Sequence, residues 1–153
     1  MKDFFKKYKV HKMKHYLMLL FIMLFVVNLS AQKTDIEYNY AIVISDNIEK
    51  PLTLENIQKA LVEVNVNFRP DVLNRIIIES GNLKSRLTTL GNNLFGMRKA
   101  GARPTTALPK KLYGYATYRH WIYSIIDYKL WEEYNSPRTY ETYKSYLRRR
   151  HWN

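Results

Sequence analysis

Apolar residues recur at helical spacing along much of this 153-residue chain, which restricts it to folds built mainly from helices. The first such stretch, residues 53–81, divides into two helices. Thr53 is the expected N-cap of the first helix, which ends near Asn65. Pro70 begins the second helix, because its fixed backbone angle suits the first turn, and Gly81 ends it.

A second helical stretch follows after a break in the pattern. The 3.6-residue period returns at His120, and apolar residues on two faces predict a helix that is buried on most sides. Pro137 begins a last helix that runs through Leu147. The basic triplet Arg148–Arg150 complements the negative end of that helix dipole.

Residues 91–118 interrupt the helical pattern and hold four of the five glycines. The runs Leu94–Met97 and Tyr113–Tyr118 are rich in residues that favour strands, so they predict a small hairpin-like lobe. The expected fold class is therefore mainly α with a small β-hairpin lobe (α+β), in one domain that covers residues 52–153.

Residues 32–51 form an N-terminal arm before this domain. The β-branched run Ala41–Ile44 fits either a short strand or an extended segment packed on the core. No function is assigned to the arm.

Residues 1–31 have the layout of a secretory signal peptide: six lysines, then an apolar run from Tyr16 to Val27. The run is shorter than the roughly 20 residues that a membrane-spanning helix needs. Cleavage after Ala31 is the favoured interpretation, and an uncleaved anchor is the alternative, because Leu29 is larger than the residue preferred there. Both predict an exported domain, in the periplasm, outside the cell or at the cell wall, whose membrane contact is limited to this segment.

Charge and cysteine content restrict the partners further. The formal charge of +12 falls to +7 without residues 1–31, so an anionic wall or membrane surface is an expected neighbour, and a solvated basic surface without a ligand is the alternative. The chain has no cysteine, so it has neither disulfides nor thiolate metal ligands. His120 and His151, the histidines outside the leader, lack metal-ligand spacing, so neither a metal nor another cofactor is predicted.

Glu79 is the main candidate for chemistry. At 100° per residue it lies within about 60° of Val72 and Ile76, on the apolar stripe and in the last turn of its helix. Desolvation and the helix dipole both favour a protonated carboxyl there, and cleavage of a glycosidic bond needs such an acid. The alternative is an ion pair with one of three arginines: Arg75, Arg86 or Arg98.

Several separated motifs resemble the bacterial glucosaminidase family, whose members are mannosyl-glycoprotein endo-β-N-acetylglucosaminidase-like peptidoglycan hydrolases, including flagellar and Bax-like proteins. Residues 76–86 contain an ESG-x-x-x-S stretch, and residues 91–98 contain NNLFG. Tyr115–Tyr118 and the S-x-x-D-Y pattern of residues 124–128 are similar to the aromatic strand and the helix that follow in that family. The resemblance covers roughly residues 52–134.

This resemblance implies a lysozyme-like fold whose groove binds β-1,4-linked peptidoglycan strands, with Glu79 as the catalytic acid and cleavage after N-acetylglucosamine. The residues expected to bind the glycan or brace its groove are Asn92, Asn93, Phe95, Tyr115 and Tyr118. Shaping of the turn before the hairpin is the other interpretation of these asparagines and Phe95. Trp121 is assigned to the core in preference to the sugar site.

The second catalytic group is less evident. No Asp or Glu lies between Glu79 and Asp127, so Asp127 is the candidate base or nucleophile, with bracing of its helix as the favoured alternative. A substrate-assisted route needs no second carboxylate and is the preferred mechanism. Many relatives carry a functional tyrosine beyond the last helix. Either the site here is incomplete or one of three tyrosines takes that place: Tyr140, Tyr143 or Tyr146.

Three other functions remain as alternatives. The same fold supports cleavage after N-acetylmuramic acid, as in lysozymes and lytic transglycosylases, and it also supports a wall-binding module that has lost turnover. A nucleic-acid binder is the third and is not expected, since no nucleic-acid-binding motif accompanies the basic charge.

Overall fold

The computed structural model describes residues 16–24, 35–135 and 141–149. The chain divides into two compact units, Met1–Asp35 and Ile36–Asn153.

The first unit contains a helix over residues 16–24 whose side chains are all exposed. This helix lies in the apolar part of the predicted leader, while Ala31 lies outside the described residues. Among the described residues, no helix combines the length and the apolar character that crossing a membrane requires.

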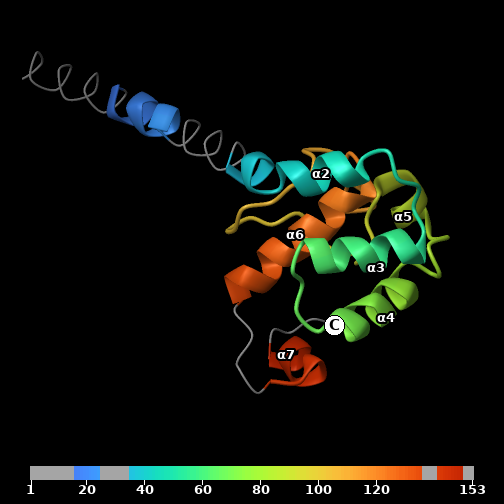
Figure 1. Ribbon diagram of the computed structural model, residues 1–153. Helices are drawn as coiled ribbons and strands as arrows, with labels where there is room; N and C mark the ends of the chain where they lie inside the picture. The colour runs from blue at the N-terminus through green and yellow to red at the C-terminus, as the bar shows by residue number, and fades with distance from the viewer. Residues whose placement is uncertain (1–15, 25–34, 136–140, 150–153) are drawn as a thin grey trace, which may run out of the picture. The chain divides into compact units, whose positions relative to one another are not determined.

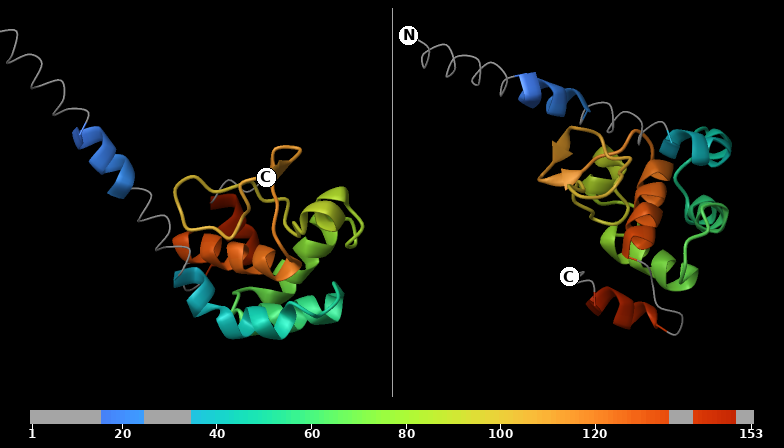
Figure 2. Two further views of the ribbon diagram at one scale, coloured as in Figure 1. Left: turned by 90° about the horizontal axis from the view of Figure 1, so that it is seen from above. Right: turned by 90° about the vertical axis from the view of Figure 1, so that its left-hand side faces the viewer.

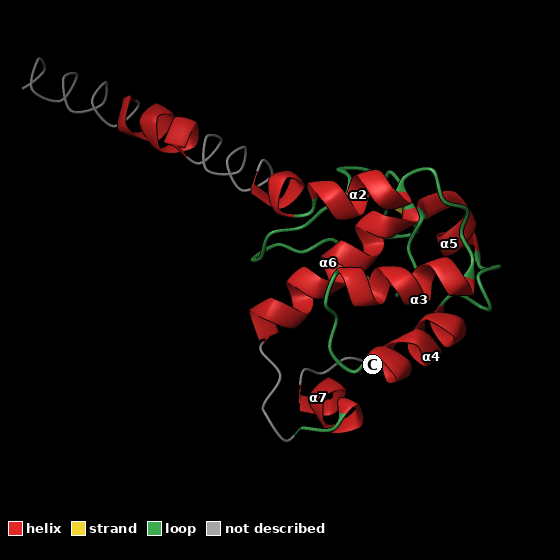
Figure 3. Ribbon diagram, viewed as in Figure 1, coloured by secondary structure: helices red, strands yellow, loops and turns green. Residues whose placement is uncertain are grey.

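The second unit is mainly helical with a small antiparallel sheet, which confirms the predicted α+β class (Figures 1 and 3). Its elements are α2 (Ala41–Asn47), α3 (Leu54–Glu63), α4 (Arg69–Glu79), α5 (Arg86–Gly91), β1 (Lys111–Leu112), β2 (Tyr115–Ala116), α6 (Trp121–Asn135) and α7 (Tyr143–Arg149). Figure 2 shows α2 and α3 on one side of α6, and the hairpin with the loop before it on the other.

Helices α3 and α4 begin close to where the sequence predicts. The Thr53 hydroxyl accepts a hydrogen bond from the Asn56 backbone N–H at 3.2 Å, which caps α3 as expected. Helix α4 starts one residue before Pro70, which therefore lies in the first turn. A side-chain cap therefore sets the start of α3, and a proline in the first turn accompanies the start of α4.

Helix α6 lies at the centre of the core and is buried on most sides, as its two apolar faces predict. Trp121, Ile122, Ile125, Ile126 and Tyr128 are all at most 2% exposed. Full burial of one such aliphatic side chain contributes about 1.5–3 kcal/mol, so this helix supplies much of the packing energy.

The run Ala41–Ile44 forms α2, so the prediction of a strand or an extended segment is wrong. The helix lets Val43 and Ile44 pack on the core. It also lets Asn47 donate to the carbonyl of Val43 at 2.8 Å and to Oε2 of Glu63 at 2.7 Å. These tertiary contacts override the weak preference of β-branched residues for strands.

The hairpin is shorter than predicted and lies within residues 111–116. Its two-residue turn has positive φ at Tyr113 (54°) and Gly114 (84°), the backbone of a type I′ turn. Residues Leu94–Met97, predicted as a strand, do not form one. They contribute a single backbone bond to the sheet region, from the N–H of Ala116 to the carbonyl of Met97 at 2.9 Å.

The last helix begins at Tyr143, which corrects the predicted start at Pro137, a residue that lies outside the described ones. Glu141 and Thr142 are not helical. The Thr142 hydroxyl accepts from the Ser145 N–H at 3.3 Å, so a threonine cap sets the start. The helix packs on Phe68, whose ring centroid lies 5.7 Å from that of Tyr143 and 5.9 Å from that of Tyr146.

Candidate functional site

Glu79 lies in the last turn of α4 with 31% of its side chain exposed, not on the buried stripe that the sequence predicts. Its Oε1 is 2.7 Å from Nη2 of Arg75, one helical turn earlier. Val72 and Ile76 are fully buried, whereas the Glu79 side chain, in the last turn of the helix, reaches solvent. The ion pair with Arg75 is the alternative that the sequence analysis left open.

The carboxylate of Glu79 lies against the loop that contains the NNLFG motif. A Cβ atom added at Gly96 would be 3.3 Å from Oε2 of Glu79, and Gly96 has a φ of +63°. The close approach and the positive φ both favour glycine here. Two motifs that are separated in the sequence therefore meet at this carboxylate.

Asn93 organises this loop through its side-chain amide. Its Nδ2 donates to the carbonyls of Met97 and Ala116, both at 2.9 Å. Its Oδ1 accepts from the backbone N–H of Phe95 at 3.3 Å and of Met97 at 3.1 Å. Asn93 is 1% exposed, so it braces the loop instead of presenting an amide at the surface.

Asn92 and Phe95, the other two residues of this motif that were predicted to bind glycan or brace its groove, also have structural roles. Asn92 ends α5 with a φ of 52°, and its amide donates to the carbonyls of Tyr118 at 3.1 Å and Arg119 at 3.3 Å. Phe95 is buried and stacks on Tyr128, with ring centroids 4.4 Å apart. The turn-shaping role is thus the one that these contacts show.

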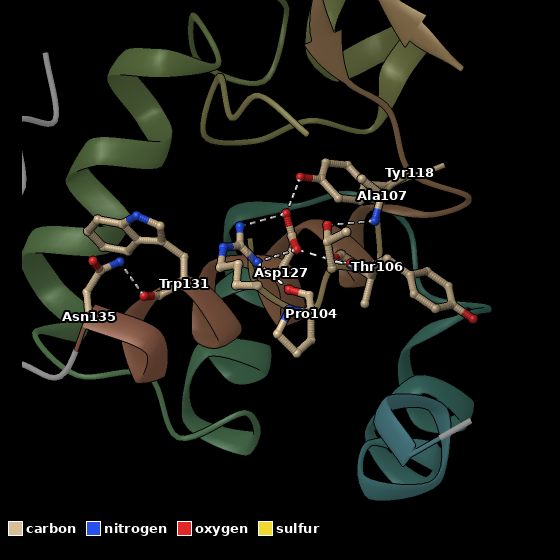
Figure 4. Close-up of polar contacts among 10 residues, drawn as sticks. Pro104, Thr106, Ala107, Tyr118, Asp127, Trp131 and Asn135 are labelled. Carbon is tan, nitrogen blue, oxygen red and sulfur yellow. Dashed lines mark hydrogen bonds and ion pairs between the residues drawn. The ribbon is translucent and has the colours of Figure 1, made fainter. Parts of the chain in front are cut away.

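Asp127 is fully buried on α6 and brings the loop before the hairpin onto that helix (Figure 4). Its two oxygens accept from Nη1 and Nη2 of Arg103 at 2.9 and 3.2 Å. They also accept from the Thr106 N–H at 3.3 Å and the Tyr118 hydroxyl at 2.8 Å. These contacts are those of the favoured bracing role.

Tyr118 belongs to this cluster and not to an accessible sugar platform. It is 3% exposed. Burial raises the pKa of its hydroxyl well above the ordinary value, and the negative charge of Asp127 raises it further. The role of Arg103 could not be predicted, since nothing in the sequence pattern distinguishes it from the other basic residues of this segment.

Tyr115 is the predicted aromatic residue that remains partly exposed, on β2. The guanidinium carbon of Arg98 lies 5.7 Å from its ring centroid. At the hairpin turn, Arg86 covers Tyr113 in the same way at 5.6 Å. The hairpin therefore carries two tyrosines, each covered by an arginine from outside it.

The tyrosines of α7 are buried. Tyr143 is 9% exposed, and burial raises the pKa of its hydroxyl above the ordinary value. Its ring centroid lies 5.7 Å from that of Phe68, the residue just before the helix that carries Glu79. Tyr146 is fully buried, and Tyr140 lies outside the described residues.

Other candidate sites add no reactive group. Within the described parts of the chain, no three His, Cys, Asp or Glu side chains are grouped in a way that could hold a metal ion. Trp121 is in the core, as assigned, and its indole N–H donates to the carbonyl of Lys50 at 3.1 Å. Comparisons of this chain with protein-family models, curated proteins and solved structures found no match.

Proposed function

We propose that this protein is an exported peptidoglycan hydrolase with a lysozyme-like fold that cleaves the β-1,4 bond after N-acetylglucosamine, with Glu79 as general acid. The supporting observation is the position of Glu79, whose partly exposed carboxylate lies against Gly96. Two separated motifs that resemble the glucosaminidase family thus meet at one titratable group. A glycan strand placed there would contact the carboxylate and the loop together.

The proposed chemistry is substrate-assisted. The 2-acetamido oxygen of the sugar attacks the anomeric carbon while Glu79 transfers its proton to the departing glycosidic oxygen. Water then opens the cyclic intermediate at the anomeric carbon and returns a proton to Glu79. This route fits a chain in which residues 80–126 contain no Asp or Glu and the oxygens of Asp127 are already bonded.

Arg75 has a role in this scheme because it contacts the same carboxylate in the free protein. The acid must reach the glycosidic oxygen, whereas in the free protein its Oε1 lies 2.7 Å from Nη2 of Arg75. Substrate binding therefore has to separate the two side chains before the acid step. The pair is partly exposed, so separating it costs at most about 1 kcal/mol.

The test is a peptidoglycan gel assay that compares wild type with Glu79→Gln. We expect the wild type to clear the gel and the variant to fail. Glu55→Gln is the matched control, because Glu55 is also paired with a basic residue one turn away, Lys59 at 2.7 Å. Circular dichroism should show that both variants are folded.

Three results would contradict the enzyme proposal: no clearing by wild type, equal clearing by Glu79→Gln, or loss of clearing in Glu55→Gln. Mass spectrometry of the digest then identifies the bond, since cleavage after N-acetylglucosamine leaves that sugar at the new reducing end. A new muramic acid end would instead indicate lysozyme-like or lytic-transglycosylase cleavage.

A wall-binding module without turnover is the second candidate, and the Arg75–Glu79 ion pair is the observation that favours it. A carboxylate held by an arginine does not reach a glycosidic oxygen unless substrate separates the two side chains. This candidate predicts that the protein sediments with insoluble peptidoglycan without releasing soluble fragments. Glu79→Gln would then bind as well as the wild type.

A further inference from the structure

The lobe between α4 and α6 carries an unbalanced positive charge. Residues 80–126 include eight Lys and Arg and no Asp or Glu. Arg103 is buried and paired with Asp127. The other seven have exposed side chains: Lys84, Arg86, Arg98, Lys99, Lys110, Lys111 and Arg119. Within the described residues none of these seven forms an ion pair.

Arg98, like Arg86, lies over a tyrosine ring, and the fold also fixes the backbone beside it. The N–H of Ala116 donates to the carbonyl of Met97 at 2.9 Å, so the residues next to these two, Tyr115 and Arg98, are neighbours. The guanidinium lies over the tyrosine ring at 5.7 Å. An arginine held in this way keeps its N–H edge available to a carboxylate, with less conformational freedom to lose on binding.

Arg98 is also close to Glu79 along the chain path. A Cβ added at Gly96 would lie 3.3 Å from Oε2 of Glu79, so this backbone is near the carboxylate. Arg98 follows two residues later, within roughly 7 Å of Gly96 along the backbone even if fully extended. A polymer that places a bond at Glu79 therefore brings its neighbouring substituents within reach of the Arg98 side chain. The pair of Arg86 and Tyr113 extends the same basic surface at the hairpin turn.

We propose that Arg98, held on the ring of Tyr115, is a subsite for a carboxylate carried by the muramic acid side of the glycan strand. The proposal rests on the proposed function for the identity of the strand. Two sources offer this carboxylate: the lactyl group of muramic acid and the peptide stem attached to it. A strand of N-acetylglucosamine alone carries neither and is neutral.

The experiment measures dissociation constants for three ligands of equal length: glycan with peptide stems, glycan freed of stems, and a neutral β-1,4 N-acetylglucosamine oligomer. All proteins carry Glu79→Gln so that no ligand is hydrolysed. Arg98→Gln is compared with Arg148→Gln, which removes the same charge from an exposed position on α7. Tyr115→Phe keeps the ring, and Tyr115→Leu removes it.

We expect Arg98→Gln to weaken binding of the carboxylate-bearing glycan by about tenfold or more, since hydrogen bonds to charged groups contribute most at such sites. Binding of the neutral oligomer should not change, and Arg148→Gln should match the parent protein. Tyr115→Leu should weaken the charged ligand and Tyr115→Phe should not. If the loss is seen with the stem-bearing glycan, a peptide carboxylate is the ligand, since the lactyl carboxyl is then an amide. If it is seen only after the stems are removed, the freed lactyl carboxylate is the ligand.

The subsite is overturned if Arg98→Gln behaves like Arg148→Gln on every ligand, or if it weakens the neutral oligomer equally. These outcomes are separate from failure of the proposed enzyme. Arg98-dependent binding without gel clearing by wild type keeps the subsite and rejects the hydrolase. Clearing without Arg98 dependence keeps the hydrolase and rejects the subsite.

Discussion

Asp127 on α6 and Arg103 in the loop before the hairpin form a two-point ion pair, with N–O distances of 2.9 and 3.2 Å. Both side chains are buried, at 0% and 6% exposure. Two charges are costly to remove from water, and this cost is offset when each charge is paired and further hydrogen-bonded. Thr106 and Tyr118 supply those additional bonds to Asp127. The cluster therefore fastens the long loop to the central helix.

Asp127→Asn should destabilise the protein by about 3–5 kcal/mol, because it leaves the buried Arg103 charge without its partner. Urea unfolding measures this loss. Glu79→Gln breaks a partly exposed pair and should cost less than about 1 kcal/mol in the same assay. A stable Asp127→Asn protein that has lost only catalysis would favour the catalytic role over bracing.

Gly96→Ala should lower both stability and gel clearing. The added methyl group would meet the Glu79 carboxylate at 3.3 Å, and the positive φ is strained for alanine by about 1 kcal/mol. Gly101→Ala is the control, since a Cβ there has no neighbour within 4 Å and its φ is not positive. Thermal melts and gel assays of the two variants should differ. Equal behaviour would mean that the Gly96 contact with Glu79 does not matter.

Asn93→Ala should cost more than about 2 kcal/mol, because buried backbone N–H and carbonyl groups of the loop lose their partner. Asn92→Gly should cost less, since glycine tolerates the φ of 52° and the Asn92 side chain is partly exposed. Urea unfolding ranks the two. An Asn93→Ala protein that unfolds like wild type but binds glycan poorly would show that Asn93 acts on substrate instead.

His120 should make folding sensitive to mild acid. Burial lowers the pKa of its imidazole below the ordinary value of 6.5, so between that lowered pKa and 6.5 the unfolded chain binds more protons than the folded protein. Stability therefore rises as pH rises through this window and falls as the solution is acidified. His120→Gln removes this proton uptake.

The measurement is the free energy of unfolding of both proteins at pH 7.5 and pH 5.5. Wild type should lose more stability on acidification than His120→Gln, and all other titrating groups are shared. Equal losses would show that the imidazole is as easily protonated in the folded protein as in the unfolded chain.

The helical part of the fold could be predicted because its signals are local. Thr53 caps α3 and Pro70 lies in the first turn of α4, and each acts within a few residues of its own position. The prediction for segment Ala41–Ile44 was wrong because contacts with another helix stabilise it as a helix. One of these is the hydrogen bond from Asn47 of α2 to Glu63 of α3. No local pattern contains that contact.

The geometry of the candidate site could not be predicted from the sequence. Periodicity places Glu79 near the buried stripe, but a 100° rotation per residue cannot decide between the edge and the centre of that stripe. The bonds of Asn93 join residues up to 23 positions apart, and Arg103 meets Asp127 across 24. Such pairings form through the folded loop, so spacing alone did not reveal them.

The contact of Phe68 with Tyr143 and Tyr146 has a consequence for any shortened version of the chain. Removing residues 136–153 would uncover the aromatic faces of Phe68 and Trp131, which Tyr146 now covers. Newly exposed aromatic surface promotes self-association. A shortened protein for crystallisation or assay should therefore keep α7, since its loss would expose aromatic side chains that bind other copies of the chain.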